Sequence, residues 1–267
     1  MKKSVTLLLA AFFCFSLQGK EVVRLAAGEW PPYISEKLDY YGIISHLTTE
    51  AFATQGIETK IEFYPWQRVL QVSKNAEVDG AFAYVHTPER DETYLFSEPI
   101  YQGKYVLFHL KSTKLQWKDY KDLKDIRIAA PRGFGGMGPD FLAAEEKKVI
   151  TVDRVTTVEQ TFNMLFLGRV QAVPSDLEVG YVLVRQNFDQ KDFDRLTHNE
   201  KVIHLAKYCL IMPKKSKKSA ALIKKFNLGI EALKKSGRYN QIVKDFYSKK
   251  VYRESLPPNY TSSAQVF

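Results

Sequence analysis

The order of apolar and polar positions divides the chain into short strands that alternate with amphipathic helices. Apolar residues of 42–56 recur at the spacing of one helical face, and Gly56 follows as a residue that tolerates positive φ. In the N-terminal half the predicted elements are a strand at 22–27, a helix at 42–56, a strand at 59–64, a helix at 65–75 and a strand at 79–85. This order predicts an α/β sheet.

A second unit repeats the same rhythm. Its predicted elements are a strand at 125–130, a glycine-rich turn at 132–138, a helix at 138–147, a strand at 149–152, a helix at 157–167, a strand at 172–174 and a helix at 176–186. Strands at 105–110 and 208–212 would connect the units, and helices near 219–237 and 238–247 follow. Two units joined by two extended strands make a hinge with a cleft between them.

The stretch GEWPPY, Gly28 to Tyr33, places two large aromatic residues where regular structure cannot hide them. Its two prolines forbid a helix and remove two backbone donors. In open α/β sheets, ligands bind beyond the carboxyl ends of the strands. GEWPPY, 84–90, 131–136 and Asp176 all follow predicted strands. We therefore predict that these aromatic residues line the mouth of the cleft.

The N-terminus predicts export. Lys2 and Lys3 precede an apolar run, 5–17, that is too short to span a bilayer, and a small residue precedes Lys20. We expect 1–19 to be a cleaved signal peptide and the protein to be soluble in the periplasm, with an uncleaved anchor as the alternative. The residues before Cys14 lack the small side chains of a lipoprotein signal.

Charge and cysteine content exclude some classes of protein. The formal net charge of +9 owes part of its excess to the lysines of 214–218, a run typical of a solvated surface. No nucleic-acid-binding motif is present, so we expect no nucleic-acid partner. Beyond the predicted leader only Cys209 remains, which forbids an internal disulfide, and its apolar neighbours predict a buried thiol.

Several short motifs, in this order, resemble a known family. They are GEWPPY at 28–33, VDG at 78–80, TPER at 87–90, FSEPIY at 96–101, the segment from GRV at 168–170 to Asp176, and SGRY at 236–239. The chain resembles the periplasmic solute-binding proteins of polar amino acid ABC transporters, bacterial extracellular solute-binding protein family 3.

The resemblance covers nearly all of the chain after the leader and implies a fold. That fold is α/β, the two-lobed type II periplasmic binding protein fold, in which a two-strand hinge joins two α/β lobes. The implied domains are lobe 1 at 20–107 and 207–255, lobe 2 at 108–206, and a C-terminal tail at 256–267, which we expect to be disordered from 257 onward.

The resemblance also implies roles for two charged residues. Arg90 matches the family's arginine that clamps a ligand carboxylate, and a guanidinium suits a carboxylate bidentately. The alternative is a surface ion pair with Glu89, Asp91 or Glu92. Asp176 matches the acidic residue that holds the ligand's ammonium, and the alternative is a cap for the helix that follows.

Trp30 and Trp66 match aromatic positions of the family's pocket wall, where they could sandwich a flat or cationic group; the alternative is that both belong to the core. The full set of predicted ligand-binding residues is Arg90, Asp176, Trp30, Trp66, Tyr84, Thr87, Gly133, Phe134, Gly135, Tyr33 and Arg132.

Two departures from the family pattern affect the ligand. The second lobe has RGFGG at 132–136 where the family has a Gly-Thr-Thr-like turn, so a hydroxyl is lost while backbone amides remain for an anion. Ala83, Tyr84 and Val85 replace the family's serines. Arg68 and Arg132 add positive charge. These changes favour a ligand with an extra acidic group or a bulkier aromatic body over an ordinary amino acid.

The resemblance implies a binding protein that passes a small polar solute to an ABC transporter permease. The expected ligand is an amino acid or related carboxylate, and we expect a monomer without catalytic residues, cofactor or metal. One alternative is an enzyme on this scaffold, like the cyclohexadienyl-type dehydratases, for which His86 is the histidine nearest the predicted pocket. Another is a ligand-sensing subunit of a signalling system. No zinc-ligand spacing or Gly-x-Ser-x-Gly motif is present.

Overall fold

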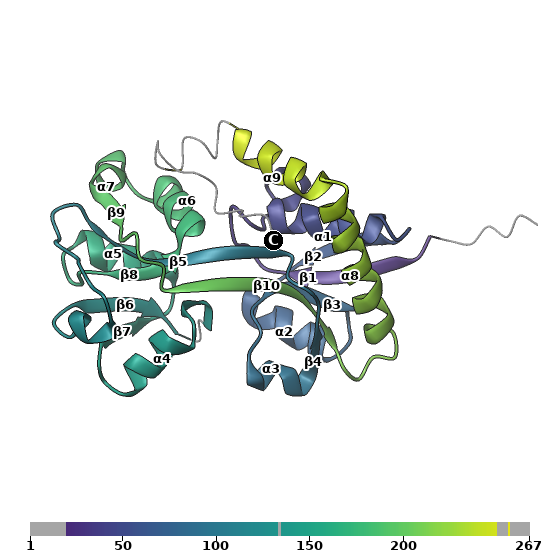
Figure 1. The fold of residues 1–267 in the computed structure, drawn as a ribbon, viewed down its shortest axis with the longest axis horizontal. Helices are drawn as coiled ribbons and strands as arrows, with labels where there is room; N and C mark the ends of the chain where they lie inside the picture. The colour runs from purple at the N-terminus through teal and green to yellow at the C-terminus, as the bar shows by residue number, and fades with distance from the viewer. Residues whose placement is uncertain (1–19, 133–134, 250–255, 257–267) are drawn as a thin grey trace, which may run out of the picture.

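The computed structural model describes residues 20–132, 135–249 and 256, and within them two groups of elements lie side by side along the long axis (Figure 1). We call the group that contains the first strand lobe 1. It consists of β1 (Val22–Ala27), η1 (Asp39–Tyr41), α1 (Ile43–Ala53), β2 (Glu58–Phe63), α2 (Trp66–Lys74), β3 (Gly80–Tyr84), α3 (Pro88–Thr93), β4 (Tyr94–Phe96), α8 (Ser219–Lys235) and α9 (Arg238–Ser248).

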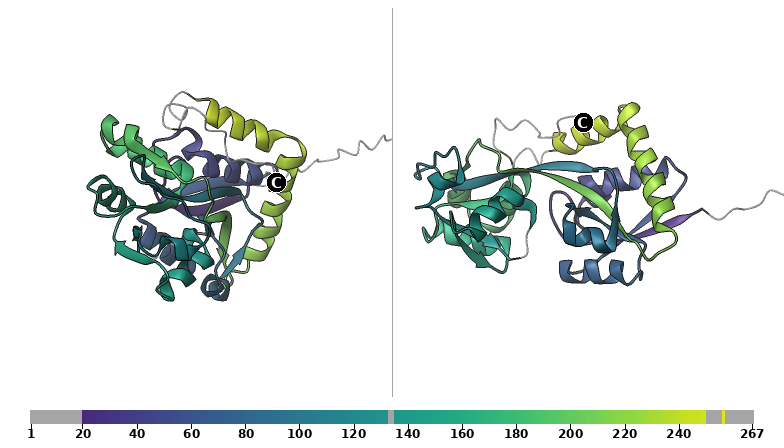
Figure 2. Two further views of the ribbon diagram at one scale, coloured as in Figure 1. Left: turned by 60° about the vertical axis from the view of Figure 1, so that its left-hand side comes forward. Right: turned by 60° about the horizontal axis from the view of Figure 1, so that its bottom comes forward.

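The other group, lobe 2, comes from the middle of the chain. It consists of η2 (Tyr120–Leu123), β6 (Arg127–Pro131), η3 (Gly135–Met137), α4 (Pro139–Glu146), β7 (Thr151–Val155), α5 (Val158–Phe166), β8 (Val173–Asp176), α6 (Leu177–Asn187), α7 (Gln190–Arg195) and β9 (Leu196–His198). Two long strands, β5 (Tyr101–Leu110) and β10 (His204–Pro213), run from one lobe to the other, as all three views show (Figures 1 and 2).

The pairing of β5 with β10 makes the hinge. Residues 101–105 of β5 pair antiparallel with 204–208 of β10. On the lobe 1 side β10 pairs with β3 and β4, and on the lobe 2 side β5 pairs with β8 and β9. One sheet of order β2-β1-β3-β10-β5-β8 therefore passes through both lobes, while β6 and β7 form a separate parallel pair. Two α/β lobes on a two-strand hinge, predicted from the sequence, are confirmed.

The lobe limits predicted at 107/108 and 206/207 fall inside β5 and β10. They stay a prediction, because a strand shared by both lobes has no natural break. The predicted signal peptide, 1–19, lies outside the described residues, as does the predicted tail except for Leu256. That residue is buried in the apolar cluster of lobe 2 that includes Phe108 and Phe162.

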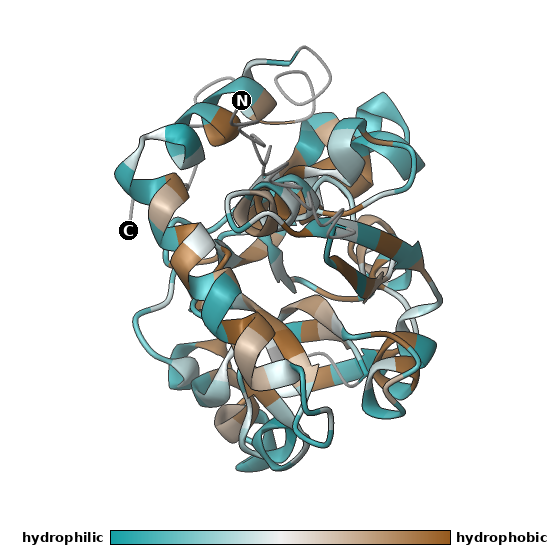
Figure 3. Ribbon diagram, turned by 90° about the vertical axis from the view of Figure 1, so that its right-hand side faces the viewer, coloured by the Kyte–Doolittle hydropathy of each residue, from teal (hydrophilic) through white to brown (hydrophobic). Residues whose placement is uncertain are grey.

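Burial follows the apolar pattern that predicted the elements. All five residues of β3 are buried, because this strand lies between β1 and β10 and has a covered face on each side. Helix α8 buries one side through residues such as Leu222, Phe226 and Ile230. Figure 3 shows the corresponding mixture of hydrophilic and hydrophobic residues along the helices that face the viewer.

The structure adds elements that the sequence pattern did not predict. Helix α3 begins at Pro88, after the cap residue Thr87, and both α3 and α7 have only six residues. β4 and β9 have three residues each. Such short elements leave no periodicity to read, and they exist because strand neighbours and caps satisfy their backbones. The two hinge strands also begin four residues earlier than predicted, at Tyr101 and His204.

No helix among the described residues is long and apolar enough to cross a membrane.

Candidate functional site

A row of aromatic rings leads across lobe 1 to Arg90. Trp30, in the turn after β1, lies with its ring centroid 6.4 Å from that of Trp66, the first residue of α2. The ring of Trp66 lies 5.8 Å from that of Tyr84, which ends β3. The guanidinium of Arg90, in α3, lies 5.1 Å from the centroid of Tyr84. These four predicted residues thus lie together at or just after the carboxyl ends of β1, β2 and β3. Ligands of open α/β sheets bind at this edge.

Trp66 is fixed at the start of its helix. Its indole N–H donates to the carbonyl of Glu29 over 2.9 Å, and a side chain on Gly28 would clash with its ring, because a Cβ there would lie 2.5 Å from the indole. Both Trp30 and Trp66 remain partly exposed while packing against the core. The GEWPPY turn therefore needs its glycine, since the indole occupies the space beside it.

Arg90 has no carboxylate partner within the described part of the chain. Its Nη1 donates to the carbonyl of Val85 over 2.8 Å, and Thr87 caps the helix by accepting from the amide of Arg90 over 3.4 Å. Asp91 is instead paired with His86, whose Nε2 lies 2.8 Å from Oδ1. The alternative of a surface ion pair is therefore not what the structure shows. Burial lowers the pKa of the Arg90 guanidinium, against a smaller rise caused by Tyr84.

The hydroxyl of Tyr84 is a second polar group beside Arg90. The side chain is 7% exposed, and its oxygen has no hydrogen-bond partner among the described residues. Burial raises the pKa of this phenol, so the group is neutral and can donate. Buried polar atoms without a partner are rare, because each costs about 1–3 kcal/mol. A cation and a free donor therefore lie next to each other at the end of β3.

Asp176 lies at the end of β8, where its carboxylate is enclosed by its own chain. Oδ1 accepts from the hydroxyl of Tyr33 at 2.7 Å and from the amides of Glu178 and Val179 at 3.1 and 3.3 Å. Oδ2 accepts from the hydroxyl of Tyr208 at 2.9 Å. The two amides make Asp176 the cap of α6, the alternative that the sequence left open. The residue is 1% exposed.

The surroundings of Asp176 favour its protonated form. Burial and, to a smaller extent, the nearby carboxylate of Glu178 raise its pKa, and the hydrogen bonds from Tyr33 and Tyr208 act in the opposite direction; the resulting pKa is about 7. The first cause is the largest, because a charge buried in a protein loses its hydration. Tyr33 itself is fully buried, and desolvation followed by the charge of Asp176 raises its pKa as well.

The remaining predicted residues lie on lobe 2. Arg132 is exposed, and its backbone amide donates to the carbonyl of Val155 over 2.9 Å. Gly135 begins the short helix η3. Gly133 and Phe134 lie outside the described residues. A cavity of about 10 Å³ lies between Trp30 of lobe 1 and the lobe 2 segments around Pro131 and Asp176, with room for about one water molecule.

Comparison with known proteins identifies the chain. The model of the bacterial extracellular solute-binding proteins, family 3, matches residues 23–249. The chain belongs to this family. No curated protein matches the sequence. The resemblance inferred from the motifs is thereby confirmed.

Several solved structures share the fold. A mutant of ArgBP from T. maritima superposes with a TM-score of 0.66 at 23% identity, over 85% of this chain and 96% of that one. The substrate-binding protein of an amino acid ABC transporter superposes with a TM-score of 0.65 at 18% identity, over 85% of this chain and 100% of that one. A histidine kinase sensor domain similar to periplasmic binding proteins superposes with a TM-score of 0.70 at 18% identity, over 85% of this chain and 96% of that one. The predicted type II periplasmic binding protein fold is confirmed, and the protein is a solute-binding protein.

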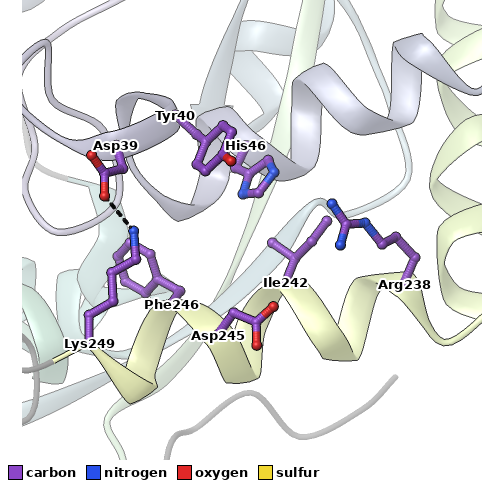
Figure 4. A pocket seen from close by; sticks show the side chains of 8 residues that line it. All are labelled: Asp39, Tyr40, His46, Arg238, Ile242, Asp245, Phe246 and Lys249. Carbon is purple, nitrogen blue, oxygen red and sulfur yellow. Dashed lines mark hydrogen bonds and ion pairs between the residues drawn. The ribbon is translucent and has the colours of Figure 1, made fainter.

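A more spacious cavity of this family 3 protein lies away from the predicted site. It measures about 500 Å³ and lies between the η1–α1 segment and α9 of lobe 1 (Figure 4). Three of the charged residues that line it are already paired: Lys249 lies 2.6 Å from Asp39, and Arg238 lies 3.3 Å from Glu50. The sequence-predicted residues that are described do not line it. We therefore place the candidate site at the aromatic row and not in this cavity.

Sequence reasoning missed a group of buried tyrosines around the hinge. Tyr101, on β5, shares hydrogen bonds with Glu178 of lobe 2 and with Tyr247 of α9, and its hydroxyl lies 2.7 Å from that of Tyr247. Tyr247 also donates to Glu178. Tyr208 holds Asp176 as described above. The signal that could have found them is the density of tyrosine on strands 101–105 and 204–208, since a buried phenol needs a polar partner.

The described residues contain no cluster of His, Cys, Asp and Glu arranged to hold a metal ion.

Proposed function

We propose that this protein is a periplasmic substrate-binding protein that captures a small polar solute, an amino acid or related carboxylate, between its lobes. Arg90 is the clamp for the ligand carboxylate. The observation that carries the proposal is that Arg90 lies partly buried on Tyr84 without a carboxylate partner in the described chain. A desolvated cation is costly unless an anion joins it, and a ligand supplies that anion.

The ligand's body fits the aromatic row. Trp66 and Trp30 continue from Tyr84 at ring distances of 5.8 and 6.4 Å, so a solute held at Arg90 meets aromatic surface next. Such contacts are worth about 0.5–1.5 kcal/mol each beyond the area they bury. On lobe 2 the exposed side chain of Arg132 adds a positive charge. Closure of the two lobes on the hinge then sequesters the solute.

We further propose that the closed form delivers its solute to the permease of an ABC transporter. The amino acid ABC transporter protein and ArgBP named above support this assignment through their shared fold. Export through cleavage before Lys20 belongs to the same proposal. The periplasmic fraction should contain a chain whose mass begins at Lys20, and retention of 1–19 would contradict export by cleavage.

The binding test uses the chain from Lys20 onward and titration calorimetry. We would titrate it with the common L-amino acids and with small mono- and dicarboxylates. Arg90→Ala is expected to weaken binding at least about 100-fold, in line with about 3 kcal/mol for a charge-assisted pair. It should leave the melting temperature of the empty protein within about 3 °C, because Arg90 makes one hydrogen bond to the backbone.

Arg185 provides a matched control. Its guanidinium lies 4.6 Å from the ring centroid of Phe193, so it also packs on an aromatic ring, but in lobe 2 and away from the aromatic row. Arg185→Ala is expected to bind ligand as the wild type does. Equal losses in the two variants, or no binding of any compound by the wild type, would overturn the proposal. Turnover of an added cyclohexadienyl acid would favour the enzyme alternative instead.

A further inference from the structure

The carboxylate that a zwitterionic ligand would need is already saturated. Four donors of the chain point at Asp176: the hydroxyls of Tyr33 and Tyr208 and the amides of Glu178 and Val179, at 2.7 to 3.3 Å. A carboxylate has about four acceptor positions on its two oxygens. An ammonium group would therefore have to displace one of these donors, which are themselves buried.

Access to this carboxylate is also closed. Gly103 of the hinge lies so near that a Cβ on it would be 2.1 Å from Oδ2. Trp30 covers the two tyrosines, with ring centroids 5.0 Å from those of Tyr33 and Tyr208. The adjacent cavity holds about 10 Å³, less than an alkylammonium group needs. Asp176 is thus not an open anion at this end of the row.

At the other end of the row the charged group is a cation, the guanidinium of Arg90, which lies 5.1 Å from the ring centroid of Tyr84. Arg90 has no carboxylate partner in the described chain, and the acid that follows it, Asp91, is engaged by His86 at 2.8 Å. The hydroxyl of Tyr84, buried and without a partner among the described residues, adds a donor and no acceptor-only group. A ligand that brought its own cation would leave that cation unpaired beside Arg90, which is unfavourable in a desolvated cleft.

We propose that the cleft selects organic anions that carry no ammonium group, with the carboxylate on Arg90 and an apolar or aromatic body against Trp66 and Trp30. This inference rests on the function proposed above and narrows its ligand class. It follows from two features of the site: Arg90 has no carboxylate partner in the described chain, and the carboxylate of Asp176 is enclosed by the fold. The body of the ligand replaces water on the exposed parts of the two indoles, which stabilises the complex.

The test compares ligands that differ in the ammonium group alone. Three pairs serve: L-phenylalanine with 3-phenylpropanoate, L-tryptophan with indole-3-propanoate, and L-glutamate with glutarate. Each is titrated into the chain from Lys20 onward by calorimetry. We expect the acid without the ammonium group to bind at least tenfold more tightly in every pair that binds, with the aromatic pairs ahead of the glutamate pair. Arg90→Ala should abolish this binding, and Arg185→Ala should preserve it.

The outcomes separate the two proposals. Tighter binding of the amino acid in any pair overturns the selection against ammonium while the binding function stands. Binding of neither member of any pair, together with a negative result for the wider set of amino acids and carboxylates, overturns the binding function and this inference with it. Equal binding within a pair also contradicts the inference, because it would show that the ammonium group finds a partner or stays in water.

Discussion

The hydroxyl of Tyr33 donates to Oδ1 of Asp176 over 2.7 Å, and so joins two residues that lie 143 positions apart. Tyr33 is the last residue of the GEWPPY turn of lobe 1, and Asp176 ends β8 of lobe 2 and caps α6. Both side chains are almost fully buried. A direct bond between the lobes therefore passes through the region where the sequence predicted a ligand's amino group.

Loss of this bond should destabilise the empty protein. Tyr33→Phe removes the donor and leaves the phenyl ring in place, while the buried carboxylate loses one of its four partners. We expect the free energy of unfolding to fall by about 1–3 kcal/mol, as when a buried polar group loses its partner. Urea denaturation measures it. Tyr40→Phe is the control, since that ring is 67% exposed, and it should change stability by less than about 0.5 kcal/mol.

Titration of Asp176 should make the free energy of unfolding depend on pH. Burial, followed by the charge of Glu178, raises its pKa from 3.8 to about 7. The folded protein therefore keeps a proton that the unfolded chain has released, and the free energy of unfolding falls as pH rises from near 3.8 to about 7. Asp176→Asn cannot titrate, so its stability should vary less across that window. Denaturation curves at several pH values test this, and parallel pH profiles of the two proteins would contradict it.

Gly103 should not tolerate a side chain. A Cβ at this position would lie 2.1 Å from Oδ2 of Asp176 and 2.6 Å from the hydroxyl of Tyr208. Gly103→Ala forces both groups to move, and we expect a loss of about 1–3 kcal/mol, as for overpacking of a core. Gln102→Ala, one residue earlier on the same strand and partly exposed, is the control. If thermal denaturation gave Gly103→Ala the same melting temperature as the wild type, the hinge would have room to relax and the prediction would be wrong.

Cys209 should be unreactive in the folded protein. It is 5% exposed, and burial raises the pKa of its thiol to about 12, with a smaller contribution from Glu98. Because the thiolate is the reactive form, an aromatic disulfide reagent should label the folded protein slowly at neutral pH. Labelling should reach one thiol per chain from Lys20 onward once guanidinium unfolds it. Rapid labelling of the folded state would mean that β10 opens locally.

Much of the fold could be predicted from the sequence because its main elements are long and periodic. The first strand, Val22–Ala27, is found with the predicted limits, and helices such as Ile43–Ala53 and Val158–Phe166 lie within the predicted ranges. Short elements were missed, among them Pro88–Thr93, because six residues make fewer than two helical turns and the apolar pattern cannot repeat. The order of motifs also sufficed to indicate the family, which the match over 23–249 confirms.

The candidate site was predictable only in part. Trp30, Trp66, Tyr84 and Arg90 do lie in one row, because each follows a strand end at the same edge of the sheet. The surroundings of Asp176 were not predictable, since they depend on one tyrosine from the hinge strand β10 and another from the N-terminal turn. The roles of the predicted residues in binding stay a prediction until a ligand is tested.

The sequence by itself determined the alternation of strands and helices, the hinge and the cation at position 90, because periodicity, prolines and motif order are local properties of the chain. Only the tertiary structure decided which groups would meet. It enclosed Asp176 among Tyr33, Tyr208 and two amides, and it left Arg90 without a carboxylate partner in the described chain. The bond between Tyr33 and Asp176 joins residues 143 positions apart, and local patterns contain no information about such a pairing.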